Sequence, residues 1–286
     1  MNDTLKIALQ KSGRLSEGSM KLLSNCGVNV SNNGRRLMAQ ASNFPLEILF
    51  LRDDDIPEYV EDNVADIGVL GLNVVKEKNK SVDIVEKLGF SKCRLSLAID
   101  KNQNYTGPSF FNEKQIATSY PNILKEWLQE NNVKTDVHEI SGSVEIAPGI
   151  GLAEAICDIV STGSTLFSNG LKEVETIMHS EAVMIANRNL SSEKQTLLEK
   201  LIFRINAVNK AKTNRYILLN APNEKLEQII SILPGMKSPT VTPLADKDWS
   251  SVHSVIGEEA FWEVIDQLKL AGAEGILVVP IEKMVL

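Results

Sequence analysis

The chain has 286 residues, which is enough for about two domains that each bury a hydrophobic core. Its formal net charge of -7 argues against the basic surface with which proteins neutralise nucleic-acid phosphates, so we expect no nucleic-acid partner. No stretch approaches the roughly 18 consecutive apolar residues of a membrane span, so we expect no membrane partner either.

Cysteines and histidines are few and scattered. The residues are Cys26, Cys93 and Cys157, and His138, His179 and His253. The odd number and wide spacing of the cysteines exclude a disulfide framework and a short-spaced zinc site, and the histidines are isolated from them. The first residues lead directly into a predicted strand and lack the layout of a signal peptide. We therefore expect a reduced, cytoplasmic protein without a structural metal.

The first predicted strand, residues 5–9, ends in a turn that carries Lys11 and Arg14. A helix follows, which we expect to begin at Ser16 and to end at Gly27. Cations at the point where a strand meets a helix can bind an anion. Two cations in a surface loop are as often only solvated, and the residues alone leave both interpretations open.

The next strand, residues 46–51, is followed by Arg52 and three aspartates. Arg52 can address a phosphate through two parallel hydrogen bonds. The aspartates at 53–55 suggest a metal site, but acids that precede a helix with Pro57 in its first turn complement the helix dipole and its free amides. For at least two of them we therefore expect a helix start.

A strand at residues 65–71 ends in the turn at Gly71 and leads into a helix that reaches Lys80. A single glycine turn allows a ligand to approach the backbone, or serves only tight packing, and the sequence does not separate these alternatives. The charged run at 76–80 is expected to be a solvated helix end.

The polar segment at 100–108 contains proline and glycine and is a candidate domain boundary. A new series of strands and helices follows it. We expect a strand at 115–119, a helix at 121–131, a strand at 134–140 and a helix at 149–156. Glu145, in the turn before the last of these, is either a capping acid or an acceptor for sugar hydroxyls.

An apolar strand at 156–160 leads into five small residues, four of which carry hydroxyl groups. They are Ser161, Thr162, Gly163, Ser164 and Thr165. Free backbone amides, hydroxyl donors and the start of a helix that ends at Asn169 and Gly170 together favour a bound phosphate. A capped turn is the alternative. Because the lysine of a Walker loop is missing, the cations for such a ligand must come from elsewhere in the chain.

The remainder of the chain predicts strands at 173–185, a long helix at 191–212 and then a separate module. The module reads as strand, helix, strand, strand, helix, strand over residues 215–281, which is typical of a ferredoxin-like unit. Its small-residue turn at 271–275 is either a helix stop or an effector pocket.

Several segments in the same order closely resemble ATP phosphoribosyltransferases, the first enzymes of histidine biosynthesis. These segments are 9–15, 52–56, 66–71, 117–121, 142–148, 158–166 and 169–175, together with 239–244 and 276–283 in the last module, which marks the long, histidine-inhibited form. The sequence departs from the common pattern after the first strand, because Ser12 stands between Lys11 and Gly13 where many members have lysine-glycine-arginine. This serine-bearing variant also resembles long-form members, and it affects only the role given to each cation.

The resemblance implies an α/β fold with a two-lobed, periplasmic-binding-protein-like catalytic core and a C-terminal ferredoxin-like, ACT-like regulatory domain. The implied boundaries are 1–95 with 187–212 for one lobe, 96–186 for the other and 213–286 for the regulatory domain. The implied reaction transfers phosphoribosyl from phosphoribosyl pyrophosphate to N1 of ATP and releases pyrophosphate, with Mg²⁺. Histidine is the implied inhibitor, and a homo-oligomer, dimer or hexamer, is expected.

The implied chemistry needs no general base, because adenine N1 bears no proton at neutral pH. Catalysis then depends on positioning the substrates and neutralising the departing pyrophosphate, for which we predict the catalytic residues Lys11 and Arg52. The loop at 161–165 resembles the segment that holds the ribose 5-phosphate. The other predicted substrate contacts are Arg14, Gly71, Tyr120, Glu145 and Asp158, where Tyr120 either stacks on adenine or is a structural aromatic. The predicted effector residues are Thr240, Ala273 and Gly275.

Overall fold

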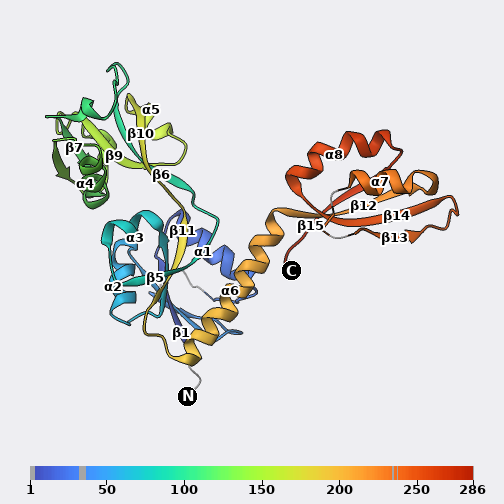
Figure 1. Ribbon diagram of the computed structural model, residues 1–286. Coiled ribbons are helices and arrows are strands. Elements are labelled where there is room, and N and C mark those ends of the chain that lie inside the picture. Colours follow the sequence, from blue (N-terminus) through green and yellow to red (C-terminus); the bar gives the residue numbers. More distant parts are fainter. Residues whose placement is uncertain (1–3, 32–36, 234, 237, 286) are drawn as a thin grey trace. The chain divides into compact units, whose positions relative to one another are not determined.

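Three β-sheets organise the residues that the computed structural model describes, which are 4–31, 37–233, 235–236 and 238–285 (Figure 1). The chain divides into two compact units, Met1–Glu199 and Lys200–Leu286. The first unit contains a six-stranded and a five-stranded sheet, and the second contains a four-stranded sheet. The units separate within the long helix, whereas the predicted boundary lies at its end, after residue 212.

The six-stranded sheet has the strand order β2-β3-β1-β4-β11-β5. Its elements are β1 (Leu5–Gln10), α1 (Arg14–Asn25), β2 (Met38–Gln40), β3 (Leu46–Leu51), the 3-10 turn η1 (Asp53–Asp55), α2 (Ile56–Glu61), β4 (Ile67–Gly71), α3 (Leu72–Lys78), β5 (Val82–Lys87) and β11 (Ala182–Asn187). The central strands β3, β1 and β4 run parallel. Their nearly continuous apolar sequences are buried because helices cover the sheet.

The five-stranded sheet has the order β10-β6-β9-β7-β8, with β7, β8 and β9 parallel. Its elements are β6 (Cys93–Asp100), η2 (Pro108–Phe111), β7 (Gln115–Thr118), α4 (Pro121–Glu130), β8 (Asp136–Glu139), η3 (Val144–Ile146), β9 (Ala155–Val160), α5 (Ser164–Ser168) and β10 (Leu171–Ser180). The predicted helix at 149–156 is wrong, because turns occupy 147–151 and β9 begins at Ala155. Gly149 and Gly151, the latter with a φ of 74°, disfavour helix there.

The chain crosses between these two sheets twice, through residues 88–92 and through Glu181. The Ala182 N–H donates to the Phe90 carbonyl at 3.0 Å, so the two crossovers pair with each other. We call the six-stranded sheet with α1, α2 and α3 the first lobe, and the five-stranded sheet with α4 and α5 the second lobe. Strand β11 belongs to the first lobe, whereas the predicted division places residues 182–186 in the other.

The second unit is built on the antiparallel order β13-β14-β12-β15. The helix α6 (Ser192–Lys212) runs into it from the first unit and is followed by β12 (Asn214–Pro222), η4 (Asn223–Lys225), α7 (Leu226–Ile232), β13 (Thr240–Pro243), β14 (Trp249–Gly257), α8 (Glu258–Leu270) and β15 (Glu274–Pro280). Helices α7 and α8 cover one face of this sheet (Figure 1). This order and packing confirm the predicted ferredoxin-like unit.

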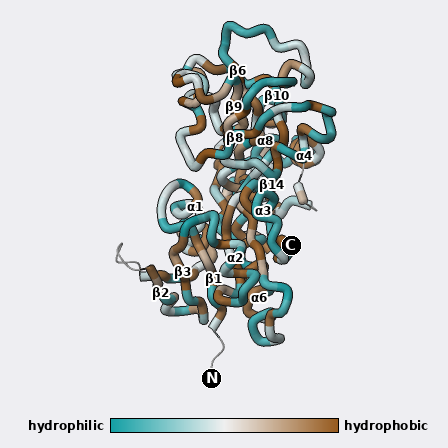
Figure 2. The backbone as a smooth tube through the Cα atoms, turned by 90° about the vertical axis from the view of Figure 1, so that its left-hand side faces the viewer, coloured by the Kyte–Doolittle hydropathy of each residue, from teal (hydrophilic) through white to brown (hydrophobic). Residues whose placement is uncertain are grey.

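Hydrophobic stretches follow the strands, and hydrophilic stretches follow many of the loops (Figure 2). Fully buried side chains such as Leu9, Ile48 and Leu97 come from the centres of the sheets. Across the described ranges, no helix combines the length and the apolar character needed to cross a bilayer.

A buried carboxylate anchors α6 to the first lobe and provides a test of its packing. Asp66, only 1% exposed, accepts hydrogen bonds from the Lys6 backbone N–H and from Lys194 Nζ, both at 2.7 Å. We expect Lys194→Met to lower the free energy of unfolding by about 3 kcal/mol, because it leaves a buried charge without its ionic partner. Urea denaturation measures this, with Arg188→Met, which breaks an exposed pair with Asp83, as the control that loses less than about 1 kcal/mol.

Candidate active site

The first-lobe candidates follow three adjacent parallel strands. Arg52 follows β3, Lys11 follows β1 and Gly71 ends β4, and parallel strands place their carboxyl ends at one edge of the sheet. The Lys11 N–H donates to the Leu51 carbonyl at 2.8 Å, which extends the β1–β3 pairing by one residue. The structure therefore brings Lys11 and Arg52 together, and both side chains are exposed.

Arg14 lies in the first turn of α1, because the helix begins two residues earlier than Ser16. Gly13 precedes it with φ 91° and ψ -179°, a conformation that is essentially restricted to glycine. No side chain caps this helix, and of the charged residues in its first turn Glu17 favours the helix dipole whereas Arg14 opposes it. A bound anion would satisfy both the free amides and Arg14, so the geometry favours the anion interpretation of this turn.

The second-lobe candidates follow strands in the same way. Tyr120 follows β7, Glu145 follows β8 within η3, and the loop at 161–165 follows β9, which itself carries Asp158. Burial raises the pKa of Asp158 to about 6, the Ile159 N–H opposes this, and the nearby Glu145 carboxylate adds to it. These two carboxylates are therefore neighbours at the edge where the loop begins.

The loop at 161–165 projects its hydroxyl groups from the protein. Thr162 and Ser164 share a hydrogen bond of 3.0 Å between their side-chain oxygens, and both residues are exposed. Gly163 has a φ of 81°, which allows the sharp bend from β9 into α5. The short helix ends at Asn169 and Gly170, as predicted. Within the part of the chain that the structure describes, the Thr162 and Ser164 hydroxyl groups bond each other and not the core.

Arg94 supports this loop, although it is not among the predicted site residues. From β6 its Nη1 donates to the Ser161 carbonyl at 3.2 Å, while Nε and Nη2 bind both carboxylate oxygens of Glu173. The guanidinium is the main cause that holds the pKa of Glu173 below its usual range. Because a trans peptide points its C=O and N–H in opposite directions, this contact turns the Thr162 N–H away from Arg94. An arginine inside an otherwise apolar strand was the signal available in the sequence.

The two groups of candidates lie at the sheet edges where the chain crosses between the lobes. In the first lobe, Ala182 at the start of β11 pairs with Gly71 at the end of β4. In the second lobe, Arg94 near the start of β6 pairs with Val160 at the end of β9. The crossovers connect these edges directly, so strand register alone brings both groups to the junction of the lobes.

Tyr120 and Gly71 are engaged in packing at this junction. Tyr120 Oη accepts a hydrogen bond of 3.1 Å from Asn73 Nδ2, and its ring packs against the second-lobe core. Burial, followed by the charge of Asp158, raises the pKa of Tyr120. A Cβ atom on Gly71 would lie 2.3 Å from Asn73 Oδ1, so this glycine makes room for Asn73. These contacts favour the structural interpretation of both residues.

The expected solvated helix end at 76–80 is wrong at Glu77. This side chain is 6% exposed and accepts hydrogen bonds from the backbone N–H groups of Asn122 and Ile123. Burial raises the pKa of Glu77, and these hydrogen bonds act in the opposite direction. A carboxylate from the first lobe therefore binds the start of a second-lobe helix.

The effector candidates do not meet within one chain. Thr240 lies in β13, whereas Ala273 and Gly275 flank the start of β15, and these strands form opposite edges of the four-stranded sheet. Ala273 is buried, and Gly275, the second residue of β15, has a φ of 58°. Two strands separate Thr240 from the other two residues.

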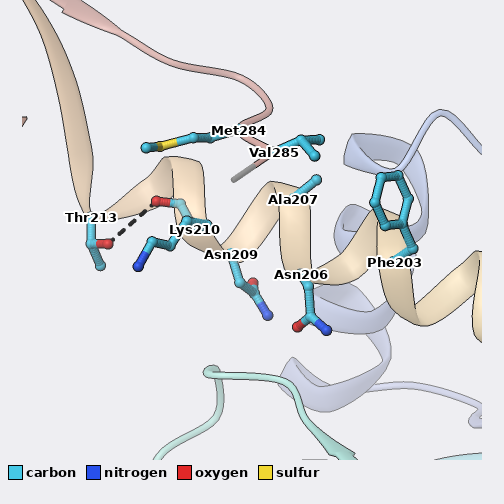
Figure 3. Close-up of a pocket in the computed structure, with 8 residues that line it drawn as sticks. All are labelled: Phe203, Asn206, Ala207, Asn209, Lys210, Thr213, Met284 and Val285. Carbon is cyan, nitrogen blue, oxygen red and sulfur yellow. Dashed lines mark hydrogen bonds between the residues drawn. The ribbon is translucent and has the colours of Figure 1, made fainter. Parts of the chain in front are cut away.

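A separate pocket of about 540 Å³ lies in the second unit, between α6 and the C-terminal segment (Figure 3). Its lining residues are Phe203, Asn206, Ala207, Asn209, Lys210, Thr213, Met284 and Val285. The Met284 N–H donates to the Ala207 carbonyl at 2.9 Å and fixes one wall. None of the predicted site residues lines this pocket. Among the described residues, no cluster of three or more His, Cys, Asp or Glu side chains is arranged to hold a metal ion.

Known proteins resemble the whole chain. The family model for ATP phosphoribosyltransferase matches residues 52–207, and the model for the HisG C-terminal domain matches residues 211–283. The chain is 59% identical to the ATP phosphoribosyltransferase of Cytophaga hutchinsonii over 285 residues, which covers 100% of both chains. It is 57% identical to that of Bacteroides thetaiotaomicron over 98% of this chain and 99% of the relative. The chain belongs to the ATP phosphoribosyltransferase family.

Solved structures agree with this assignment. The ATP phosphoribosyl transferase (HisG:HisZ) complex from Thermotoga maritima matches with a TM-score of 0.60 and 30% identity, over 71% of this chain and 98% of that chain. A substrate-binding protein of an amino acid ABC transporter matches with a TM-score of 0.50 and 11% identity, over 73% and 94%, and shows the fold alone. The predicted two-lobed, periplasmic-binding-protein-like core is confirmed. The chain is a pentosyltransferase of the family that catalyses the first step of histidine biosynthesis.

Proposed function

We propose that this chain joins phosphoribosyl pyrophosphate and ATP at the two sheet edges beside the crossovers. One observation carries the proposal: an edge with exposed cations and an edge with an exposed hydroxyl loop meet at the same junction. In the reaction, adenine N1 forms a bond to the anomeric carbon while the bond from that carbon to pyrophosphate breaks. The pyrophosphate leaves with the electron pair and takes on negative charge.

Charge on the departing pyrophosphate determines what the protein must supply. Lys11 and Arg52 are proposed to bind it, since both end adjacent parallel strands and carry exposed cationic side chains. Arg14, at the uncapped start of α1, adds a third positive group together with free backbone amides. Because N1 has no proton to lose at neutral pH, positioning and charge neutralisation supply the catalysis.

The second lobe is proposed to hold the ribose 5-phosphate and the sugar. Thr162 and Thr165 present hydroxyl donors, and Arg94 orients the loop backbone through the Ser161 carbonyl. The neighbouring carboxylates of Asp158 and Glu145 can accept hydrogen bonds from the ribose hydroxyls. This arrangement keeps the anomeric carbon between the phosphate anchor of one lobe and the cations of the other.

A divalent metal is a requirement of the family, and we propose Mg²⁺. Mg²⁺ binds largely through substrate phosphates and water and takes only one or two protein carboxylates. Asp158 and Glu145 provide oxygen donors of that kind beside the phosphate loop. When bound, the ion would neutralise part of the charge on the pyrophosphate.

Regulation and assembly form a further part of the proposal. We propose histidine as the inhibitor, a homo-oligomer as the assembly and the cytoplasm as the location. Since Thr240 lies two strands away from Gly275 within one chain, a shared effector site would take these residues from two copies of the ferredoxin-like domain. Dimer and hexamer both allow such pairing.

Incubation with ATP, phosphoribosyl pyrophosphate and Mg²⁺ tests the activity. We expect pyrophosphate and N1-(5-phosphoribosyl)-ATP in equal amounts, measured by chromatography. Thr162→Val and Thr165→Val should each raise the KM for phosphoribosyl pyrophosphate about 10-fold, because each removes a hydrogen bond to a charged group. Ser168→Ala is the matched control, since its hydroxyl donates to the Ser164 carbonyl one turn earlier in α5. Binding of both substrates without formation of product would contradict the proposal and would favour a non-catalytic binding protein.

A pH profile tests the role of Asp158. Its pKa in the free protein is about 6, so it is protonated below that pH and can no longer accept two hydrogen bonds from a sugar as a carboxylate. We expect the KM for phosphoribosyl pyrophosphate to rise as the pH falls from 7 to 5. In Asp158→Asn the KM should depend less on pH. The ratio of the KM values of the wild type and the variant at each pH removes the effect of the substrate's own titration. If the KM of the wild type and of Asp158→Asn depended on pH in the same way, Asp158 would not bind the sugar.

Light scattering with and without histidine tests the shared effector site. We expect histidine to change the oligomeric state or its stability, and Thr240→Val to raise the histidine concentration for half-inhibition about 10-fold through loss of one hydrogen bond. Thr242→Val, on the same edge strand, is the control. If the wild type, Thr240→Val and Thr242→Val needed the same histidine concentration for half-inhibition, the effector site would lie elsewhere.

A further inference from the structure

Helix α3 of the first lobe supplies the N-terminal cap of helix α4 of the second lobe. The Glu77 carboxylate accepts the Asn122 N–H at 2.9 Å and the Ile123 N–H at 3.0 Å, and the Glu77 carbonyl accepts Asn122 Nδ2 at 3.0 Å. Backbone N–H groups in the first turn of a helix have no partner within the helix. The second-lobe helix is thus completed by a residue of the first lobe.

Helix α4 has no substitute for this cap in its own sequence. Its N-cap residue Tyr120 makes no side-chain hydrogen bond to the helix, and the first turn carries no acidic residue. Glu77 is almost completely buried, and a buried carboxylate is tolerated only when hydrogen bonds compensate for its lost hydration. The hydrogen bonds from the start of α4 provide that compensation. Because they form only when the carboxylate faces these N–H groups, they fix the position of α3 relative to α4.

One turn earlier, Asn73 makes a second set of bonds to the other lobe. Its N–H donates to Ser180 Oγ at 3.1 Å, and Ser180 Oγ donates to Asn73 Oδ1 at 2.7 Å. Asn73 Nδ2 donates to Tyr120 Oη at 3.1 Å. Residues four positions apart lie on one face of a helix, so Asn73 and Glu77 present a single face to the segment 120–123 and to the end of β10.

This face joins the two halves of the active site. Helix α3 begins directly after Gly71, at the edge that carries Lys11 and Arg52. Tyr120 is the N-cap residue of α4, two residues after the end of β7, and burial followed by the charge of Asp158 at the other edge raises the pKa of its hydroxyl. We propose that Asn73 and Glu77 are positioning residues that hold these two edges in the register that phosphoribosyl transfer requires.

The expected consequence is a loss of rate rather than of binding. The proposal rests on the function proposed above, in which the nucleophile and the leaving group are held by groups on opposite edges. Misplacement by about 1 Å between reacting atoms lowers the rate of transfer by up to about 100-fold, although each substrate still meets its own edge. A residue that only stabilised the fold would leave the rate constant unchanged below the unfolding transition.

Glu77→Gln is the decisive variant, because it keeps the shape of the side chain and removes its charge. We expect kcat to fall about 10-fold or more, with both KM values changed less than about 3-fold. Hydrogen exchange of peptides that cover 121–130 should become faster, while that of 192–199 stays unchanged. Lys194→Met is the matched control, since it breaks the buried ion pair between α6 and the first lobe and should leave kcat unchanged.

A wild-type kcat in Glu77→Gln, together with faster exchange of α4, would overturn the inference. If Glu77→Gln fails to fold, Tyr120→Phe replaces it, because this change removes the hydroxyl that accepts from Asn73 Nδ2 and keeps the ring. A lowered kcat supports the inference there too, and an unchanged kcat overturns it. These outcomes remain distinct from failure of the proposed function, which the wild-type enzyme would reveal by forming no product.

Discussion

Parallel strand pairing is the constraint from which the arrangement of the active site follows. In each lobe three adjacent strands run in the same direction, so the residues that follow them gather at one edge. Both edges are also those where the chain passes between the sheets. No side chain needs to be placed individually to bring the cations of one lobe to the hydroxyl loop of the other, because backbone register already does so.

Electrostatics then differentiate the two edges. The first-lobe edge leaves Lys11 and Arg52 exposed and has an uncapped helix beside them, so it is prepared to receive negative charge. At the second-lobe edge, Arg94 is neutralised by Glu173 and acts on the loop through backbone geometry. At the same edge, burial raises the pKa of Asp158, and a perturbed pKa is typical of groups at functional sites. One lobe contributes exposed cationic side chains, and the other contributes hydrogen-bond direction.

Most of the fold could be predicted from the sequence, because long apolar runs bounded by turns indicate the strands, and their alternation with helices indicates the α/β class. The prediction failed at 149–156, where apolar residues have helical spacing but two glycines make turns more favourable. Glu77 and Arg94 were missed for a different reason. Their partners lie 45 or more residues away in the chain, so each looked like an isolated charge whose role only tertiary contacts reveal.

The pairing of the two crossovers also has a consequence for how the protein folds. Residues 88–181 form an insertion between β5 and β11, and the Leu88 N–H donates to the Ala182 carbonyl at 2.9 Å where the insertion begins and ends. Strand β11 can join the first sheet only after this long segment has brought its ends together, and closure costs less entropy once the segment is compact. The second lobe is therefore expected to fold early, as its own unit, and the first sheet to be completed last.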